Sequence, residues 1–446
     1  MVSEGENGTA HTRKLVGHAA FKRHNPLSDK FASHKFEHVE FYCGDATTTS
    51  RRFGYGLGMT LIAKSDQGTG NHRFCSYVMR SGDITFTFTA PYSITAAATH
   101  TAATANDSSS TPPPIPWFDQ EHAYDFLKRH GLAVRSMAIR VSDAEEAFQT
   151  SVENGAIAVQ QPTVLKDEIT GTSSTVSEVV LYGDVVLRYV SGDYTGPYLP
   201  GYVPVNDAPV VDYGLRRLDH AVGNVPQLIP AVEYICNFTG FHEFAEFVSE
   251  DVGTVDSGLN SMVLANNTEM ILLPINEPTF GTKRKSQIET YLEQNEGAGL
   301  QHLALKTDDI VKTLREMRAR SDYGGFDFMP NLGPSYYKEL PERIGDALPA
   351  EKYKECEELG ILVDIDDQGV LLQIFTKPLG DRPTVFIEII ERLCTAEEQH
   401  DRNRVGEGEG VVEEIGGCGG FGKGNFGALF KSIEVYETDL GINKQF

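Results

Sequence analysis

Basic residues are scarce in this chain, and so are long apolar runs. Its 446 residues include 39 lysines and arginines against 63 aspartates and glutamates, which gives a formal net charge of −24. Such a balance repels nucleic acid and anionic lipid, and it excludes partners of both kinds. No apolar stretch approaches the length of a transmembrane helix. We therefore expect a small-molecule ligand, and neither nucleic acid nor a membrane as a partner.

Cysteine is also sparse, and the cysteines show no paired spacing. This pattern predicts reduced thiols in a cytoplasmic protein. The opening Met-Val-Ser-Glu-Gly-Glu contains early acids and no apolar core region, so a secretory signal is not expected and a transit peptide is poorly supported. The six cysteines are Cys43, Cys75, Cys236, Cys356, Cys394 and Cys418.

What is present is enough chain for two cores. A chain of 446 residues is too long for one interior, and 40% hydrophobic with 23% charged residues is typical of a globular protein. A strand, a helix and several further strands follow one another in that order four times along the chain, which indicates an internal repeat. We therefore predict two domains, each built from two copies of this unit.

Shifts in composition mark the domain boundaries. We predict a flexible N-terminal arm over residues 1–33, a first domain that binds no metal over 34–195, a linker over 196–212 and a second domain over 213–446. The linker is rich in glycine and proline. Residues 95–116 are of low complexity and suggest a surface insertion, and residues 396–410 are acidic and contain glycine, as is typical of a mobile loop.

Three polar residues lie in stretches that otherwise indicate buried strands. His220 lies in Arg-Leu-Asp-His-Ala-Val, His302 in Leu-Gln-His-Leu-Ala-Leu, and Glu388 in Phe-Ile-Glu-Ile-Ile. Each buried polar group needs a partner, and each residue alone is more often a hydrogen-bonded core residue or part of an ion pair. Together they form the two-histidine, one-carboxylate ligand set of a non-haem Fe(II) site, and nearly equal stretches of chain separate them.

Comparison of the repeats distinguishes the two halves of the chain. Aligning the four first strands places these residues at one position: His38, Met137, His220 and His302. Aligning two closing strands places Arg188 against Glu388. An arginine cannot ligate a cation, so only the second half is expected to bind metal.

The predicted metal site leaves room for reactants. Three protein ligands on one face of an octahedral Fe(II) leave three positions, two for a chelating 2-oxo acid and one for O2. Gln373 and Phe375 share a strand face, and the amide of Gln373 needs a hydrogen-bonding partner there. Gln301 precedes His302 and points to the opposite face of a regular strand. Both reach one pocket only where the strand bends.

A glycine-rich stretch precedes the last predicted helix. Its sequence, Gly-Gly-Cys-Gly-Gly-Phe-Gly-Lys-Gly-Asn-Phe, could suggest a phosphate loop, but a strand-to-helix unit with Gly-Lys-Ser/Thr is missing and the net charge disfavours an anion. We prefer a flexible hinge before a helix on which Phe426 and Phe430 share one face. Two alternatives stay open: this helix covers the pocket as a lid, or its phenylalanines pack in the core.

Long literal strings in the second half are those of a known family. They include Gly-Phe-His-Glu-Phe-Ala-Glu-Phe, Leu-Pro-Ile-Asn-Glu-Pro, Glu-Gly-Ala-Gly-Leu-Gln-His-Leu-Ala and Gly-Gly-Phe-Gly-Lys-Gly-Asn-Phe. Through them the chain resembles the 4-hydroxyphenylpyruvate dioxygenase family, in its plant form, from about residue 33 onward. The resemblance implies an α+β protein of the vicinal oxygen chelate fold. Each domain would contain two βαβββ modules in an open barrel-like sheet with outer helices, and a C-terminal helix would serve as lid.

The resemblance also implies roles for individual residues. His220, His302 and Glu388 would bind Fe(II), and Phe375 and Phe426 would sandwich the aromatic ring of the substrate. Three pocket residues would act in catalysis: Gln301, Gln373 and Phe426. The full substrate-binding set would be Ser261, Asn276, Gln287, Gln301, Gln373, Phe375, Phe386, Phe421 and Phe426.

The family reaction converts 4-hydroxyphenylpyruvate and O2 into homogentisate and CO2 by oxidative decarboxylation, ring hydroxylation and side-chain migration. All four electrons come from this one substrate. In plants the reaction belongs to tyrosine and phenylalanine catabolism and feeds plastoquinone and tocopherol biosynthesis. A homodimer is also predicted, without a residue pattern that marks its interface. The open alternatives are benzylic hydroxylation as in 4-hydroxymandelate synthase, ring cleavage as in extradiol dioxygenases, and a metal-free binding protein.

Overall fold

Four copies of one folding unit make up most of the molecule, two in each half of the chain. The first half contains β1 (Ser33–Tyr42), α1 (Ala46–Leu57), β2 (Thr60–Ser65), β3 (Phe74–Ser81) and β4 (Ile84–Pro91), then β5 (Ala133–Val141), α4 (Ala144–Glu153), β6 (Ala158–Lys166), β7 (Ser173–Tyr182) and β8 (Val185–Gly192). The second half contains β10 (Leu215–Asn224), α5 (Leu228–Thr239), β11 (His242–Phe247), β12 (Leu259–Ala265) and β13 (Leu272–Pro278), then β14 (Gly299–Thr307), α8 (Ile310–Ser321), α9 (Pro334–Ile344), α10 (Ala350–Leu359), β15 (Leu362–Ile365), β16 (Gly369–Phe375) and β17 (Phe386–Cys394). The fourfold repeat and the α+β class predicted from the sequence are confirmed.

The computed structural model of the protein describes residues 14–104, 113–252, 258–281, 283–366, 368–394 and 416–442. Within these ranges, no helix combines the length and the apolarity needed to cross a bilayer. The loop predicted over residues 396–410 and the start of the predicted arm lie outside the described residues.

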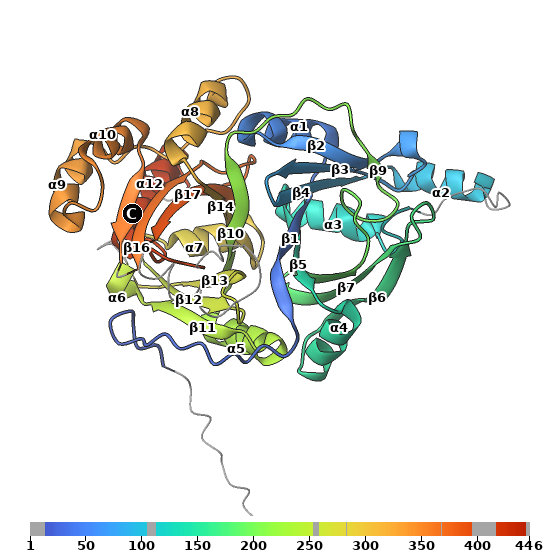
Figure 1. The fold of residues 1–446 in the computed structure, drawn as a ribbon, viewed down its shortest axis with the longest axis horizontal. Coiled ribbons are helices and arrows are strands. Elements are labelled where there is room, and N and C mark those ends of the chain that lie inside the picture. The colour runs from blue at the N-terminus through green and yellow to red at the C-terminus, as the bar shows by residue number, and fades with distance from the viewer. Residues whose placement is uncertain are drawn as a thin grey trace, which may run out of the picture.

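Each half curls one sheet, and the two sheets stand side by side (Figure 1). The module helices α1, α4, α5 and α8 lie on the outer faces, whereas α3 (Gln120–His130), α7 (Gln287–Gln294) and α12 (Phe426–Asp439) lie within the curl of the sheets. The first sheet has the order β6-β7-β8-β5-β1-β4-β3-β2-β9, where β9 is the short strand Val203–Pro204. The second has the order β11-β12-β13-β10-β14-β17-β16-β15. Because β10, β14 and β17 are adjacent, the strands that carry the three predicted metal ligands lie next to one another.

Hydrogen-bonded caps set where the module helices begin. The side chains of Asp45, Asp143 and Asp309 accept backbone N–H groups in the first turns of α1, α4 and α8. Helix α5 begins differently, because the backbone N–H of Leu228 donates to the carboxylate of Glu277 on β13, at 2.7 Å. These caps end each first strand at a similar point, so the first strands of the modules can occupy equivalent places.

Strand register shows how the two halves correspond. His38 and Arg188 both pair with the same alanine of β5. His220 and Glu388 both pair with the same alanine of β14. Arg188 therefore occupies the place of Glu388, in agreement with the alignment of the repeats.

The register corrects the alignment for the remaining ligand. His302 pairs with Val222, and the residue of β5 in the same relation is Ser136, which pairs with Glu40. The alignment with Met137 was therefore wrong by one residue. A slip of one residue moves a side chain to the other face of a sheet, and sequence alone does not reveal such a slip.

The N-terminal segment is bound where it is described. Residues 14–32 run along the edge of the second half, below β11 and α5 in the view of Figure 1. The backbone N–H of Gly17 donates to Glu246 at 2.6 Å, and that of His18 donates to Asp251 at 2.7 Å. The expectation of a flexible arm therefore does not hold for residues 14–33, because carboxylates of the second half accept hydrogen bonds from the backbone N–H groups of this segment.

Two other segments are more regular than expected. The low-complexity stretch begins with α2 (Ile94–Thr104), which projects away from the rest of the molecule (Figure 1). In the predicted linker, β9 pairs with β2 and the side chains of Tyr198, Leu199 and Tyr202 are buried. These apolar side chains between the prolines pack with the first half, so this stretch is more than a spacer.

The prediction of reduced thiols is wrong for one pair. Cys394, at the end of β17, and Cys418, in the glycine-rich stretch, form a disulfide with a Cα–Cα distance of 5.7 Å. Their sequence separation of 24 residues carries no recognisable signal. The two cysteines meet because the glycine-rich segment packs against the sheet. There the side chain of Arg392 donates a hydrogen bond to the carbonyl oxygen of Cys418.

Candidate metal centre and substrate pocket

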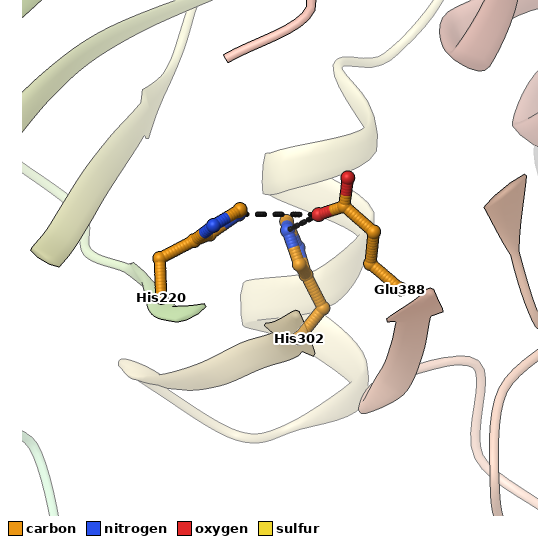
Figure 2. A group of neighbouring side chains, drawn as sticks. All are labelled: His220, His302 and Glu388. Carbon is orange, nitrogen blue, oxygen red and sulfur yellow. Dashed lines mark ion pairs between the residues drawn. The ribbon is translucent and has the colours of Figure 1, made fainter. Parts of the chain in front are cut away.

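Three side chains from neighbouring strands point toward one another in the second half (Figure 2). They are His220 of β10, His302 of β14 and Glu388 of β17, and all three are buried. Nε2 of His220 lies 3.1 Å and Nε2 of His302 lies 3.3 Å from Oε2 of Glu388. One ligand atom from each residue lies within 4.8 Å of the others. The structure thus brings together the three residues predicted to bind metal.

A β-bulge precedes each of the two histidines. The pairing of β10 with β14 skips Asp219 next to His220, and it skips Gln301 next to His302. A bulge bends the strand and allows two successive side chains to approach the same side. Gln301 and His302 accordingly both line one pocket. This is the bend that the sequence analysis required.

The bulged residues also orient the two imidazole rings. Nδ1 of His220 donates to Oδ2 of Asp219 at 2.9 Å, and Nδ1 of His302 donates to Oε1 of Gln301 at 2.9 Å. Because each Nδ1 donates to its neighbour, Nε2 is the nitrogen that gives up its proton when a cation binds, and its lone pair then serves as the ligand. Two imidazole nitrogens and one carboxylate oxygen form the facial set that suits Fe(II), so these residues fit the metal that the resemblance implies.

The charge at the centre favours a cation. Burial by itself raises the pKa of Glu388, but the charge and hydrogen bond of His220 and the hydrogen bond of His302 lower it to about 2. Burial lowers the pKa of His302. Burial also acts to lower the pKa of His220, yet Glu388 and Asp219 outweigh it and leave that pKa raised. A buried, ionised carboxylate therefore faces two imidazoles.

A pocket opens onto these three ligands and contains nearly the whole predicted substrate-binding set. Phe386 is the exception, since its ring stacks on that of His302 with centroids 4.8 Å apart and an interplanar angle of 18°. The predicted residues that line the pocket are Ser261, Asn276, Gln287, Gln301, Gln373, Phe375, Phe421 and Phe426. The lining residues that the sequence analysis missed are Val222, Phe247, Leu259, Val263, Pro274, Gly422, Asn425 and Leu429.

Asn425 is the polar residue among those that were missed. Its Oδ1 accepts a hydrogen bond of 2.7 Å from the hydroxyl of Tyr336, which fixes the orientation of the amide at the pocket. Asn425 lies inside the string Gly-Lys-Gly-Asn-Phe that the sequence analysis used for the resemblance. An asparagine next to a phenylalanine in that string was the available signal.

The glycine-rich segment, residues 416–422, leads into α12 (Phe426–Asp439) and lies beside the pocket. The ring of Phe421 meets that of His220 edge-on, with centroids 5.2 Å apart. Phe426 lines the pocket, and Phe430 is fully buried in the adjoining core. Phe426 thus faces the pocket and Phe430 the core, and a lid function for α12 stays a prediction. The segment's carbonyl groups bind an arginine, which is the reverse of a phosphate loop.

A buried ion pair supports the centre from behind. Arg392 of β17 donates to both carboxylate oxygens of Asp219, at 3.0 and 2.7 Å. Burial acts to raise the pKa of Asp219, but Arg392 and Arg217 outweigh it and hold that pKa well below its usual range. This ion pair was not predicted from the sequence, although a charged residue beside His220 and another inside the closing strand were visible.

Known proteins resemble the chain over almost its full length. No protein-family model matches it. The chain is 57% identical to 4-hydroxyphenylpyruvate dioxygenase from Arabidopsis thaliana, over 98% of this chain and 97% of that protein. It is 56% identical to 4-hydroxyphenylpyruvate dioxygenase from Daucus carota, over 99% of this chain and 95% of that protein.

A solved structure agrees with the fold. A triple mutant of 4-hydroxymandelate synthase from Streptomyces coelicolor superimposes with a TM-score of 0.69 at 23% identity, over 91% of this chain and 99% of that one. At this identity the likeness concerns the fold, and it confirms the predicted vicinal oxygen chelate architecture. The extent and identity of the match to the plant enzymes go further: the chain belongs to the 4-hydroxyphenylpyruvate dioxygenase family of enzymes.

Proposed function

We propose that the protein is an Fe(II)-dependent dioxygenase that converts 4-hydroxyphenylpyruvate and O2 into homogentisate and CO2. The observation that carries this proposal is the convergence of His220, His302 and Glu388 at a largely aromatic pocket, in a chain that belongs to this family. Two neutral imidazoles and one carboxylate leave a bound Fe(II) with a net positive charge. Such a centre attracts the carboxylate and keto oxygens of a 2-oxo acid.

The protein ligands would hold the metal from one side. Nε2 of His220, Nε2 of His302 and Oε2 of Glu388 are its donors, while Asp219 and Gln301 keep both rings in the tautomer that donates through Nε2. When bound, Fe(II) supplies the redox chemistry by which O2 reacts with the substrate. Because all three donors come from adjacent strands, the opposite side remains open to the pocket.

The pocket walls would place the rest of the substrate. Phe375 and Phe426 offer apolar faces for the aromatic ring, and Phe421 and Leu429 help to exclude water. Oε1 of Gln373 is buried and has no hydrogen-bond partner among the described residues, so it can accept a hydrogen bond from a ligand. These contacts favour one orientation of the ring toward the metal.

The second polar group of lining residues lies on the strands and helix around β13. Ser261 of β12 pairs in register with Asn276 of β13, and Gln287 begins α7 (Gln287–Gln294). All three line the pocket and are buried. We assign them to the polar end of the substrate, because their hydroxyl and amide groups can exchange donors and acceptors with its oxygens.

Product analysis tests this function directly. Purified protein is reconstituted with Fe(II) without oxygen, then given 4-hydroxyphenylpyruvate and air, and the products are identified by mass and chromatography. We expect homogentisate and CO2. Hydroxymandelate would indicate benzylic hydroxylation instead, a ring-opened product would indicate extradiol cleavage, and an unchanged substrate would leave a binding protein.

A matched variant ties the result to the metal centre. Glu388→Gln keeps the size of the side chain but replaces the carboxylate with a weaker, neutral ligand. We expect iron content and turnover both to fall by at least about a hundredfold, since even partners of metal ligands matter by 10- to 100-fold. Unaltered turnover in this variant would refute the assigned role of Glu388.

A further inference from the structure

Arg392 connects the metal centre with the segment that leads into α12. Its side chain is 1% exposed. Nε and one Nη donate to the carboxylate of Asp219, at 3.0 and 2.7 Å. The other Nη donates to the backbone carbonyls of Cys418 and Gly420, at 2.6 and 2.7 Å. Four of the five N–H groups of this side chain are therefore divided between two separate parts of the structure.

The first part is the histidine ligand. Asp219, which binds Arg392, accepts the Nδ1 proton of His220 at 2.9 Å. Asp219 is fully buried, and Arg217 also contacts it, at 3.2 Å. A carboxylate fixed by two guanidinium groups holds the imidazole at one angle, and the angle of the ring sets where Nε2 points.

The second part is the glycine-rich segment. Gly417, Gly419 and Gly420 have φ values of +72°, +77° and +70°, which side chains with a Cβ rarely adopt. This backbone turns the carbonyls of the segment inward to Arg392. Phe421 follows directly, and its ring lies 5.6 Å from the guanidinium and 5.2 Å from the ring of His220. The segment thus contacts the ring of His220 through Phe421, while Arg392 acts on the same ring through Asp219.

The first half of the molecule shows that the module itself does not need this arginine. Because Arg188 corresponds to Glu388, the residue that corresponds to Arg392 is Gly192, at the end of β8. The first half therefore has Gly192 at the position of Arg392, and its strands β7 and β8 still pair as β16 and β17 do. This comparison assigns Arg392 to the metal centre rather than to the fold.

We propose that Arg392 is a positioning residue that couples the metal-binding His220 to the order of residues 416–422. A cation on Nε2 fixes the ring, and through Asp219 it fixes the guanidinium that holds the segment over the pocket. The coupling is reciprocal, so an ordered segment also favours the ring orientation that binds the cation. The proposal rests on the proposed function in that the cation is its iron.

A second link between the glycine-rich segment and β17 allows the proposed role of Arg392 to be separated from simple anchoring of that segment. The disulfide between Cys394 and Cys418 fastens the same segment to the same strand. A covalent tie holds the segment whether or not a cation is present. The arginine is connected to His220 and should make the hold depend on the cation. The two ties therefore predict different responses to metal.

The test is hydrogen exchange of residues 416–422, followed by mass spectrometry on the full-length protein with and without Co(II). Co(II) stands in for Fe(II), does not require turnover, and its binding is read from its absorption bands. In the native protein we expect Co(II) to slow exchange in this segment by about tenfold, within the usual range of coupling between sites. The disulfide remains intact throughout.

Three variants separate the contributions. Arg392→Lys keeps the charge next to Asp219, but a single ammonium group cannot make both pairs of hydrogen bonds, so we expect Co(II) to bind with less than twofold slowing. Arg217→Lys changes the other partner of Asp219 and should keep the tenfold slowing. Cys394→Ser should raise exchange with and without metal while preserving the ratio.

The results can overturn the proposal in distinct ways. Full slowing in Arg392→Lys would refute it, and so would loss of slowing only in Cys394→Ser. Co(II) binding without slowing in the native protein would refute the coupling and leave the proposed reaction intact, and this result needs no variant to fold. A native protein that binds no Co(II) would remove both the metal centre and the coupling.

Discussion

The two halves of the molecule place side chains of opposite charge at equivalent positions of the same fold. In the first half the guanidinium of Arg188 lies 2.7 Å from both Glu40 and Glu178, and 3.0 Å from Nε2 of His38. In the second half Glu388 occupies the place of Arg188, and under the proposed function a bound cation supplies the positive charge there. The guanidinium of Arg188 fills its site in the first half, whereas a metal ion held by three side chains would keep open coordination positions for a ligand.

The charges in the first half are permanent. Burial acts to lower the pKa of Arg188, but Glu178 and Glu40 outweigh it and raise that pKa well above its ordinary value. Burial and then the charge of Arg188 hold the pKa of His38 well below its ordinary value, so this imidazole stays neutral. The result is an ion-pair network in the sheet, at the position where the second half holds His220, His302 and Glu388.

The largest expected effect comes from giving the second half the charge pattern of the first. Glu388→Arg removes a ligand and places a guanidinium between the imidazoles. We expect metal affinity to fall by more than about a hundredfold, because even partners of metal ligands change it by 10- to 100-fold. Metal analysis and calorimetric titration measure the loss. Undiminished binding would contradict the equivalence of the two halves.

That variant also leaves a buried arginine without carboxylates, and two further changes supply them. Val222 and Phe375 correspond to Glu40 and Glu178 by strand register. Adding Val222→Glu and Phe375→Glu to Glu388→Arg should recover part of the lost stability, measured by urea unfolding, while the metal stays absent. Recovery of metal binding in the triple variant would show that the ion-pair network does not exclude a cation.

The next effect concerns the stability of the first half. Arg188→Met leaves two buried carboxylates without their shared partner, and breaking such a buried pair costs about 3–5 kcal/mol. Urea unfolding should show this loss, with the metal content of the second half unchanged. Arg216→Met is the control, because its exposed pairs with Asp212 and Asp308 contribute at most about 1 kcal/mol. Equal losses in both variants would argue against a special network at Arg188.

A smaller effect is expected at the helix that distinguishes the second half. Phe426→Ala removes a ring from the pocket wall, so kcat/KM should fall by about ten- to a hundredfold through misplacement of the substrate, with iron content unchanged. Phe430→Ala, one turn away, removes a core ring and should lower the free energy of unfolding by about 3–5 kcal/mol. Loss of iron in Phe426→Ala would contradict its assignment to the substrate.

The smallest effect is expected at the residue that replaces His302 in the first half. Ser136 is fully buried, and its Oγ has no hydrogen-bond partner among the described residues. Removing an unpartnered hydroxyl leaves no acceptor or donor behind, so Ser136→Ala should change stability by less than about 1 kcal/mol. Thermal unfolding measures it. A loss of several kcal/mol would mean that this position carries a contact with a structural role.

The residues that could be predicted are those whose chemistry conflicts with their surroundings. A histidine or glutamate inside an apolar strand pattern needs an explanation, and this conflict identified His220, His302 and Glu388. The literal strings of the family then extended the prediction to most of the pocket wall. Phe386 was placed on that wall by the same reasoning, but its ring packs on His302 instead.

The features that were missed depend on strand register and on contacts between segments that are far apart in the sequence. The bulge at Asp219 and the pairing of Ser136 with Glu40 are properties of register, which a one-dimensional pattern does not contain. The contacts of Arg392 and the disulfide of Cys394 join residues to a segment that only folding brings near. The bound N-terminal arm was missed for the same reason.

The order of amino acids by itself determined the repeated unit, the difference between the two halves at the position of Glu388 and the three side chains proposed to bind metal, because each follows from local periodicity or from the chemistry of a single residue. Tertiary structure alone decided which nitrogen each imidazole presents, which phenylalanine faces the pocket and what holds the glycine-rich segment. Those outcomes depend on angles and contacts between strands far apart in the chain, and they arise when the sheet curls and its bulges form.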